Sequence, residues 1–160
     1  IGINRNDFVA VLQLRPGVEK DSSAVEWIAY ASNAFNTLAP FYPMVDETPE
    51  YLSNTTGDAS TENFYWASRM IAAMTDASYG RAGFHAERYQ ESGMAKSHQI
   101  LNRYDALLNK ETDPAKRQEI RQRANEEVAS MLKKEATDTL NKVLYELSNQ
   151  MKNAYSRSDA

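Results

Sequence analysis

The segment Phe8–Arg15 reads FVAVLQLR and is the first of three stretches whose residue types are typical of β-strands. Val25–Ala31 (VEWIAYA) is the second stretch, and Phe35–Tyr42 (FNTLAPFY) is the third. Their β-branched and aromatic side chains suit the pleated surface of a sheet. A Pro-Gly pair follows the first stretch and predicts a turn. The sequence therefore predicts a small antiparallel sheet of about three strands within residues 6–43.

The faces of these strands predict how the sheet is covered. Alternate residues of a strand point to opposite faces. In the first strand one face is apolar throughout, and the other begins apolar and turns polar at Gln13 and Arg15, so we expect burial on both faces at its beginning. Only residues 32–34 separate the second strand from the third, which predicts antiparallel neighbours. Pro40 has no amide hydrogen and places the third strand at an edge, or ends its regular pairing there.

Three strands are few for an independent sheet with two apolar faces. We therefore expect further strands, outside this sequence, to complete the layer. A long polar loop is predicted at residues 44–59, and helices follow it.

Helical patterns account for residues 60–156. Ser60 predicts the N-cap of a first helix over residues 61–79, which is apolar on nearly every side and expected to be central and buried. Gly80 and Gly83 are expected to end this helix. A second and more polar helix is predicted over residues 84–109, and Gly93 should weaken its middle.

The last predicted helix is the longest. Asp113 as N-cap and Pro114 at the first helical position predict its start, and neither Gly nor Pro interrupts the pattern up to Tyr155. At 1.5 Å per residue the helix would be roughly 60 Å long, whereas a compact domain of this size has a radius of gyration of about 15 Å. We therefore expect it to bend, break or pack against protein outside this chain.

Composition limits the possible classes of function. The 160 residues fit a single domain, 42% are hydrophobic and the net charge is −4, which does not favour a nucleic-acid surface. There is no cysteine, so the chain itself carries no thiol nucleophile, disulfide or thiolate zinc site. No apolar run is long enough to suggest a membrane span, and no secretion signal opens the chain. We expect a cytoplasmic location, with a secreted form left open.

No pattern predicts a metal or cofactor. The two histidines, His85 and His98, lie on different faces of the predicted helix, and no third ligand has suitable spacing. Glutamates on the last helix are interpreted as part of a solvated charged face. The polar groups at the strand ends remain, and from these Arg15 and Asn36 are chosen as candidate substrate-binding residues. Taken alone, each is more often structural than catalytic.

Three segments carry a resemblance to a known family: Leu12–Pro16 (LQLRP), Val25–Ala29 (VEWIA) and Asn36–Pro43 (NTLAPFYP). In this order they resemble the later part of the C69 family dipeptidases, which are N-terminal-nucleophile hydrolases. The likeness continues through Thr48–Tyr51 and Phe64–Trp66 into the long helices.

The resemblance implies a hydrolase that cleaves dipeptides with an N-terminal cysteine on an αββα sandwich. The thiol would attack the amide, the free α-amino group would act as base, and neighbouring donors would hold the oxyanion. This chain lacks cysteine and begins with Ile1, not Met. It is therefore expected to be the C-terminal part of such an enzyme, inactive alone and missing its N-terminal catalytic portion. Family members form oligomers, so a homo-oligomer is also implied.

Two other interpretations stay open. The chain could be a non-enzymatic helical interaction module that oligomerises through its last helix. It could also be a relative of the bile-salt or penicillin amide hydrolases, which share the sandwich. A self-contained, capped sheet would favour the interaction module, whereas an open hydrophobic edge would favour an enzyme fragment.

Overall fold

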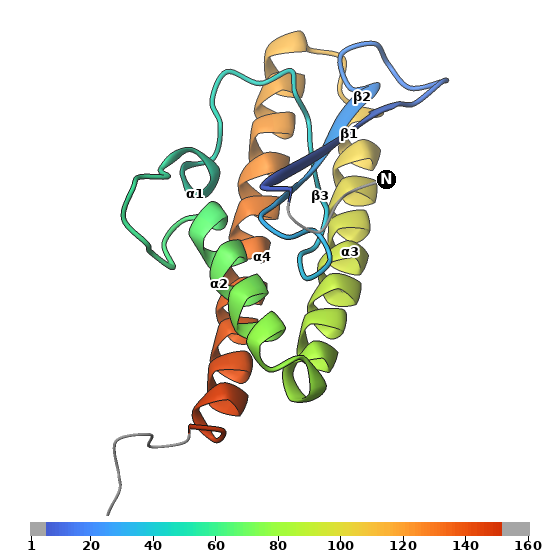
Figure 1. Ribbon diagram of the computed structural model, residues 1–160. Coiled ribbons are helices and arrows are strands. Elements are labelled where there is room, and N and C mark those ends of the chain that lie inside the picture. The colour runs from blue at the N-terminus through green and yellow to red at the C-terminus, as the bar shows by residue number, and fades with distance from the viewer. Residues whose placement is uncertain (1–5, 152–160) are drawn as a thin grey trace, which may run out of the picture.

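The computed structural model describes residues 6–151, in which a three-stranded antiparallel sheet lies against a layer of helices (Figure 1). The strands are β1 (Phe8–Leu14), β2 (Ala24–Tyr30) and β3 (Ala39–Phe41), paired in the order β1-β2-β3. The helices are α1 (Glu50–Ser53), α2 (Phe64–Ala77), α3 (Tyr79–Leu108) and α4 (Pro114–Ser148). The predicted α+β class, with a small antiparallel sheet followed by long helices, is confirmed. The assignment of residues 1–160 to a single domain stays a prediction.

The pairing of β2 with β3 is antiparallel, as predicted, and Pro40 lies in the edge strand β3. The third strand is much shorter than expected. Its predicted first half is held from the side by Gln90 of α3, whose amide donates to the carbonyls of Ala34 (3.0 Å) and Asn36 (3.2 Å). These carbonyls bond a helix side chain, so residues 35–38 connect the sheet to α3.

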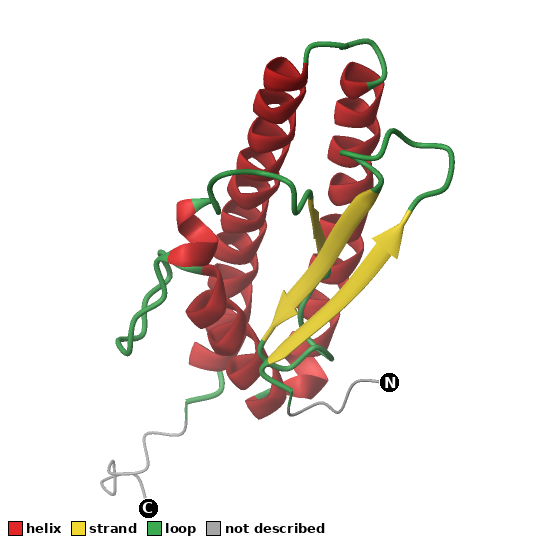
Figure 2. Ribbon diagram, turned by 90° about the horizontal axis from the view of Figure 1, so that it is seen from above, coloured by secondary structure: helices red, strands yellow, loops and turns green. Residues whose placement is uncertain are grey.

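The outer strand β1 is exposed, which corrects the expectation of burial on both faces. It pairs only with β2, and Figure 2 shows it at the outer side of the sheet. Leu12 and Leu14 are each 77% exposed. The helices cover β2 and β3 but do not reach across β1. In β2, by contrast, Val25 and Ala29 are each 1% exposed.

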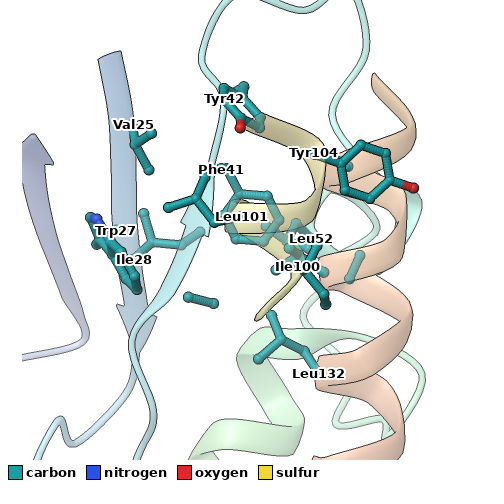
Figure 3. Close-up of a cluster of buried hydrophobic side chains, with 14 of the residues drawn as sticks. Val25, Trp27, Ile28, Phe41, Tyr42, Leu52, Ile100, Leu101, Tyr104 and Leu132 are labelled. Carbon is teal, nitrogen blue, oxygen red and sulfur yellow. The ribbon is translucent and has the colours of Figure 1, made fainter. Parts of the chain in front are cut away.

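The main hydrophobic core lies between the sheet and the helices (Figure 3). Ile28 of β2 and Phe41 of β3 belong to the same cluster as Leu52 of α1, Leu101 of α3 and Leu132 of α4. Burial of each such side chain stabilises the fold by about 1.5–3 kcal/mol relative to exposure. This cluster fixes the position of β2 against the helices.

The start of α2 differs from the prediction. Asn63, not Ser60, is the N-cap, because its side chain accepts a hydrogen bond from the Trp66 amide at 2.9 Å. The Ser60 hydroxyl instead accepts from the amide of Glu62 within the loop. The loop predicted at residues 44–59 also contains the short helix α1.

The end of α2 and its burial also need correction. The helix ends at Ala77, and Gly80 and Gly83 lie inside α3, where exposed backbone and packing against Tyr79 accommodate them. Only one face of α2 is fully buried, since Ala73 and Ala77 are exposed. The helix therefore lies at the surface rather than at the centre.

The start of α4 is as predicted: Pro114 is its first residue, and the Asp113 side chain accepts from the Ala115 amide at 2.9 Å. The 35 residues of α4 span about 52 Å. Most of this length packs inside the chain, because α3 has 30 residues and runs antiparallel beside α4 (Figures 1 and 2). The predicted uninterrupted continuation to Tyr155 is wrong, because α4 ends at Ser148 with Asn149 as its C-cap; residues 152–155 lie outside the described residues.

Among the helices of residues 6–151, none combines the length and the apolar character that crossing a membrane requires.

Candidate functional site

The two predicted site residues, Arg15 and Asn36, lie near opposite ends of β2. Arg15 follows β1, and its amide donates to the carbonyl of Ser23, which directly precedes β2. Asn36 comes after the other end of β2 and donates to the carbonyl of Ser32 at 2.9 Å. A strand of seven residues is about 23 Å long. The structure therefore does not bring the two residues into one site.

At the Arg15 end, the guanidinium group is already bound on several sides. Its two terminal nitrogens donate to the Asp105 carboxylate at 2.5 and 3.0 Å, and one also donates to the Ser22 carbonyl at 2.5 Å. Tyr42 donates its hydroxyl hydrogen to Asp105 at 2.7 Å. Burial lowers the pKa of Arg15, but the hydrogen bond and charge of Asp105 outweigh it, so the net direction is upward. Burial, reinforced by Asp105, raises the pKa of Tyr42.

A second ionic cluster adjoins the first. The Asp21 carboxylate accepts from Arg117 at 2.6 and 2.8 Å and from Arg121 at 2.6 Å. The two arginine side chains are 9% and 6% exposed. The hydrogen bond from Arg117 is the main reason that the pKa of Asp21 lies well below its usual range. Together the two clusters, which we name the hairpin anchor, join the β1–β2 turn to α3 and α4; its members are Arg15, Asp21, Asp105, Arg117 and Arg121.

The opposite end of β2 opens into a cavity of about 390 Å³ between the sheet and α2. We name it the α2 cavity, and its lining residues are Asp7, Ala31, Ser32, Phe35, Arg69, Ala72, Ala73 and Asp76. It contains charges of both signs beside an aromatic ring. Half of its lining residues are polar or charged, which makes the cavity a candidate site for a small polar ligand.

The charged groups of the α2 cavity are accessible to solvent. Arg69 donates to the Asp7 carboxylate at 2.5 Å, and the two side chains are 42% and 66% exposed. Arg69 also donates to the Tyr65 hydroxyl at 3.3 Å, and its guanidinium lies 5.6 Å from the centre of the Tyr65 ring. Tyr65 therefore restrains a guanidinium that water and solutes can reach.

The backbone is strained at the edge of the α2 cavity. Ala31 has φ +57°, and no other residue among the described non-glycine positions has positive φ. For a residue with a Cβ, the left-handed conformation costs about 1–2 kcal/mol. The Ala31 amide donates to the Asp7 carbonyl at 2.9 Å, which holds the chain in this shape. Strain of this kind is concentrated at binding and catalytic sites.

Asn36 lies behind the wall of the α2 cavity. Its side chain is buried, and its amide donates to the carbonyls of Ser32, at 2.9 Å, and Ser68, at 3.3 Å. Ser32 lines the cavity, and Ser68 precedes Arg69 in α2. The Asn36 Oδ1 atom has no hydrogen-bond partner within the described part of the chain. Asn36 thus joins the wall formed by the loop to the wall formed by α2.

The three charged residues of the α2 cavity are not among the site residues predicted from the sequence. Asp7 precedes the first strand, and Arg69 and Asp76 lie seven residues apart on a helix. One signal could have found the helical pair: residues seven apart share a helix face, and two alanines, Ala72 and Ala73, lie between them. No sequence signal brings Asp7 to that face, because the contact depends on the position of the sheet over α2.

Other polar residues considered in the sequence lie at contacts between elements. His98 lies 5.0 Å from Trp27, ring centre to ring centre, and His85 Nε2 lies 3.8 Å from Glu146. Glu135 is one of the glutamates of the last helix that the sequence predicts to be solvated, but it accepts from Ser92 and Lys96 of α3, both at 2.6 Å. Within residues 6–151, no group of three or more His, Cys, Asp or Glu is placed to hold a metal ion.

Comparison with known proteins connects this architecture to one family. The model of peptidase family C69 matches residues 1–92. "Probable dipeptidase A" of Streptococcus pyogenes serotype M18 (strain MGAS8232) is 39% identical over 160 residues, which cover 99% of this chain and 33% of that protein. "Dipeptidase" of Bifidobacterium longum (strain NCC 2705) is 37% identical over 196 residues, 99% of this chain and 37% of that protein.

A relative of lower identity also matches nearly the whole chain. "Probable dipeptidase B" of Lactococcus lactis subsp. lactis (strain IL1403) is 33% identical over 159 residues, again 99% of this chain and 33% of the relative. The chain thus spans about one third of the length of the curated relatives it matches. The resemblance noted in the sequence is confirmed, since the family model covers more than half of the chain: the protein belongs to peptidase family C69.

Proposed function

We propose that this chain is the C-terminal portion of a cysteine-type dipeptidase. In this proposal the sheet contributes to one layer of an αββα sandwich, and α2, α3 and α4 brace that layer. The relatives named dipeptidases support the activity, and the share of their length that the chain spans supports its being one portion of a larger enzyme.

The single observation that carries the proposal is the exposed face of β1. Leu12 and Leu14 lie on one face of an outer strand and are each 77% exposed, and Phe8 on the same face is 49% exposed; Val11, on the opposite face, is 48% exposed. Soluble domains rarely leave such a row of large apolar side chains on an unpaired strand, because it promotes aggregation. This open hydrophobic edge favours an enzyme portion over a self-contained interaction module.

The chemistry of the proposed enzyme would be divided between this chain and the remaining portion. A cysteine thiolate from outside this chain would attack the dipeptide amide, because the chain itself has no cysteine. We propose that Asn36 contributes by holding the wall of the α2 cavity. Arg15 would have to release Asp105 before it could bind a substrate carboxylate, so its contribution is to anchor the hairpin. Direct substrate contact by either residue stays a prediction.

Assembly and location belong to the same proposal. We expect a homo-oligomer in the cytoplasm, joined to the N-terminal catalytic portion. Leu144 and Tyr145 near the end of α4 are 55% and 65% exposed and offer apolar surface for subunit contacts. Light scattering of the assembled enzyme tests this expectation, and a monomer would contradict it.

A chimera tests the proposed function. The segment of the Streptococcus pyogenes relative that matches this chain is replaced by the 160 residues, and hydrolysis of a panel of dipeptides is measured. We expect the chimera to hydrolyse dipeptides and the isolated chain to hydrolyse none. The intact relative is the control. A chimera that folds but releases no amino acids would contradict the proposal. Robust turnover by the isolated chain would contradict the division of chemistry.

A further inference from the structure

The α2 cavity presents opposite charges at a defined separation. Arg69 and Asp76 lie on one face of α2, and seven residues place their Cα atoms about 10 Å apart along the helix axis. Both side chains line the cavity, with the small side chains of Ala72 and Ala73 between them. The space between a cation and an anion is therefore left open by two alanines.

This separation matches a small zwitterion. Two extended residues span at most about 7 Å, so the ammonium and carboxylate groups of an amino acid or dipeptide lie within that distance. Side chains that reach into the cavity from Cα atoms about 10 Å apart can contact both ends of such a molecule. A simple anion or cation would use only one end of the cavity.

Arg69 retains hydrogen-bonding capacity for a ligand. Within residues 6–151, Nη1 is the one nitrogen of Arg69 that donates, to Asp7 and Tyr65. A guanidinium has five N–H groups arranged in a fork that suits carboxylates. Nη2 and Nε can thus bind a carboxylate while Nη1 stays with Asp7, and Tyr65 keeps the group oriented.

We propose that the α2 cavity binds a zwitterion of the amino-acid class through both its ends. Arg69 receives the carboxylate, Asp76 receives the ammonium group, and Phe35 provides the apolar wall. Asn36 is a positioning residue, because it holds Ser32 and α2 at the rear of the cavity. The inference deepens the proposed function and rests on it for the choice between a dipeptide and a free amino acid. The binding itself depends only on residues of this chain.

Titration of the isotope-labelled 160-residue chain, followed by ¹⁵N NMR, tests the proposal without any activity measurement. The probes are alanylalanine, free alanine, N-acetyl-alanylalanine and alanylalanine amide. We expect saturable shifts at the lining residues with an affinity on the order of 1 mM, the weak range for so small a ligand. Blocking either terminus should weaken binding about tenfold, because one charge-assisted contact is lost.

Two variants test which residue binds the carboxylate of the ligand and which binds its ammonium group, and two matched variants serve as controls. Arg69→Gln should remove the advantage of a free carboxylate, and Asp76→Asn should remove the advantage of a free ammonium group. Arg81→Gln and Asp58→Asn change exposed charges outside the cavity and should bind as the unmodified chain does. The NMR spectrum of each variant reports whether it is folded.

The outcomes separate the alternatives. Stronger binding of alanylalanine identifies a peptide site, and stronger binding of free alanine identifies an amino-acid site; both support the proposal. Absence of saturable shifts, or equal binding of the blocked probes, overturns it. An inactive chimera would overturn the proposed dipeptidase function and leave these binding results unaffected.

Discussion

The two ends of β2 use the same residue types in opposite ways. At the Ala24 end, Asp21 is 31% exposed and accepts from two arginine side chains that are only 9% and 6% exposed, so two buried charges depend on this carboxylate. At the Tyr30 end, Asp7 and Arg69 form an equally short pair, yet these side chains are 66% and 42% exposed. One end fastens the sheet to α3 and α4, and the other leaves its charges facing a cavity.

This difference shows that the role of an Arg–Asp pair depends on how deeply the pair is buried, and not on the distance between its nitrogen and oxygen atoms. A buried charge without a partner is strongly destabilising, whereas an exposed pair exchanges its bonds with water at little cost. Only the exposed pair therefore presents a guanidinium that a ligand can reach. The comparison predicts large stability effects at the hairpin anchor and small ones at the α2 cavity.

The largest expected effect follows from Asp21→Ala. The substitution leaves Arg117 and Arg121 buried without their shared carboxylate, which should lower the free energy of unfolding by about 3 kcal/mol. Urea unfolding monitored by circular dichroism measures the change. Asp58→Ala, in the exposed loop before α2, is the matched control and should change stability by less than about 0.5 kcal/mol. Equal losses in the two variants would contradict a special role for the anchor.

Acid should weaken the same end of the molecule. The pKa of Asp21 is lowered in the folded chain, chiefly by the hydrogen bond from Arg117, so its stabilisation is complete above the unfolded pKa of about 3.9. The stabilisation is lost as the pH falls toward the folded pKa. Between about pH 5 and pH 2 the loss should be roughly 2 kcal/mol. The difference in stability between the unmodified chain and Asp21→Asn should shrink over this range; a constant difference would contradict the prediction.

A third effect tests how tightly the loop between β2 and β3 packs against α3. A Cβ atom on Gly93 of α3 would lie 2.5 Å from the Thr37 hydroxyl oxygen and 2.9 Å from the Thr37 Cβ. Gly93→Ala therefore overpacks this contact, at a cost of about 1–3 kcal/mol, and the gain in helix propensity of about 1 kcal/mol offsets part of it. We expect a net destabilisation of about 1 kcal/mol by thermal unfolding.

Gly80→Ala provides the control for Gly93→Ala on the same helix. No atom lies within 4 Å of a Cβ placed at Gly80, so this variant should be neutral or slightly more stable. A stabilised Gly93→Ala would show that Thr37 can move aside and that the loop between β2 and β3 is not tightly packed against α3.

The sequence predicts much of the fold because local signals and packing agree there. Asp113 and Pro114 mark the start of α4 through cap chemistry that operates within a few residues. The signals fail where tertiary contacts compete. The Gln90 amide donates to the carbonyls of Ala34 and Asn36, at the start of the segment predicted as the third strand. Asn63 replaces Ser60 as the cap of α2.

The candidate site is less predictable for the same physical reason. The sequence predicts Arg15 and Asn36 as polar groups at strand ends; Arg15 does directly follow β1, whereas Asn36 lies in the loop between β2 and β3. Only the folded chain shows that Asp105, ninety residues away, engages Arg15. Likewise, Asp7 meets Arg69 across 62 positions of sequence. Contacts at such separations depend on how the sheet lies over the helices, which no local pattern encodes.

The smallest expected effect completes the comparison. Asp7→Asn removes one charge from the exposed pair and keeps a side-chain oxygen that can accept from Arg69. Because solvent screens such pairs, the free energy of unfolding should change by less than about 0.5 kcal/mol, measured by urea unfolding beside Asp21→Ala. A loss similar to that of Asp21→Ala would mean that the ion pairs at both ends of β2 contribute equally to the free energy of unfolding. A small loss would show that the Asp7–Arg69 pair contributes little to folding, and Nη2 and Nε of Arg69 remain available for a ligand carboxylate while Nη1 stays with Asp7.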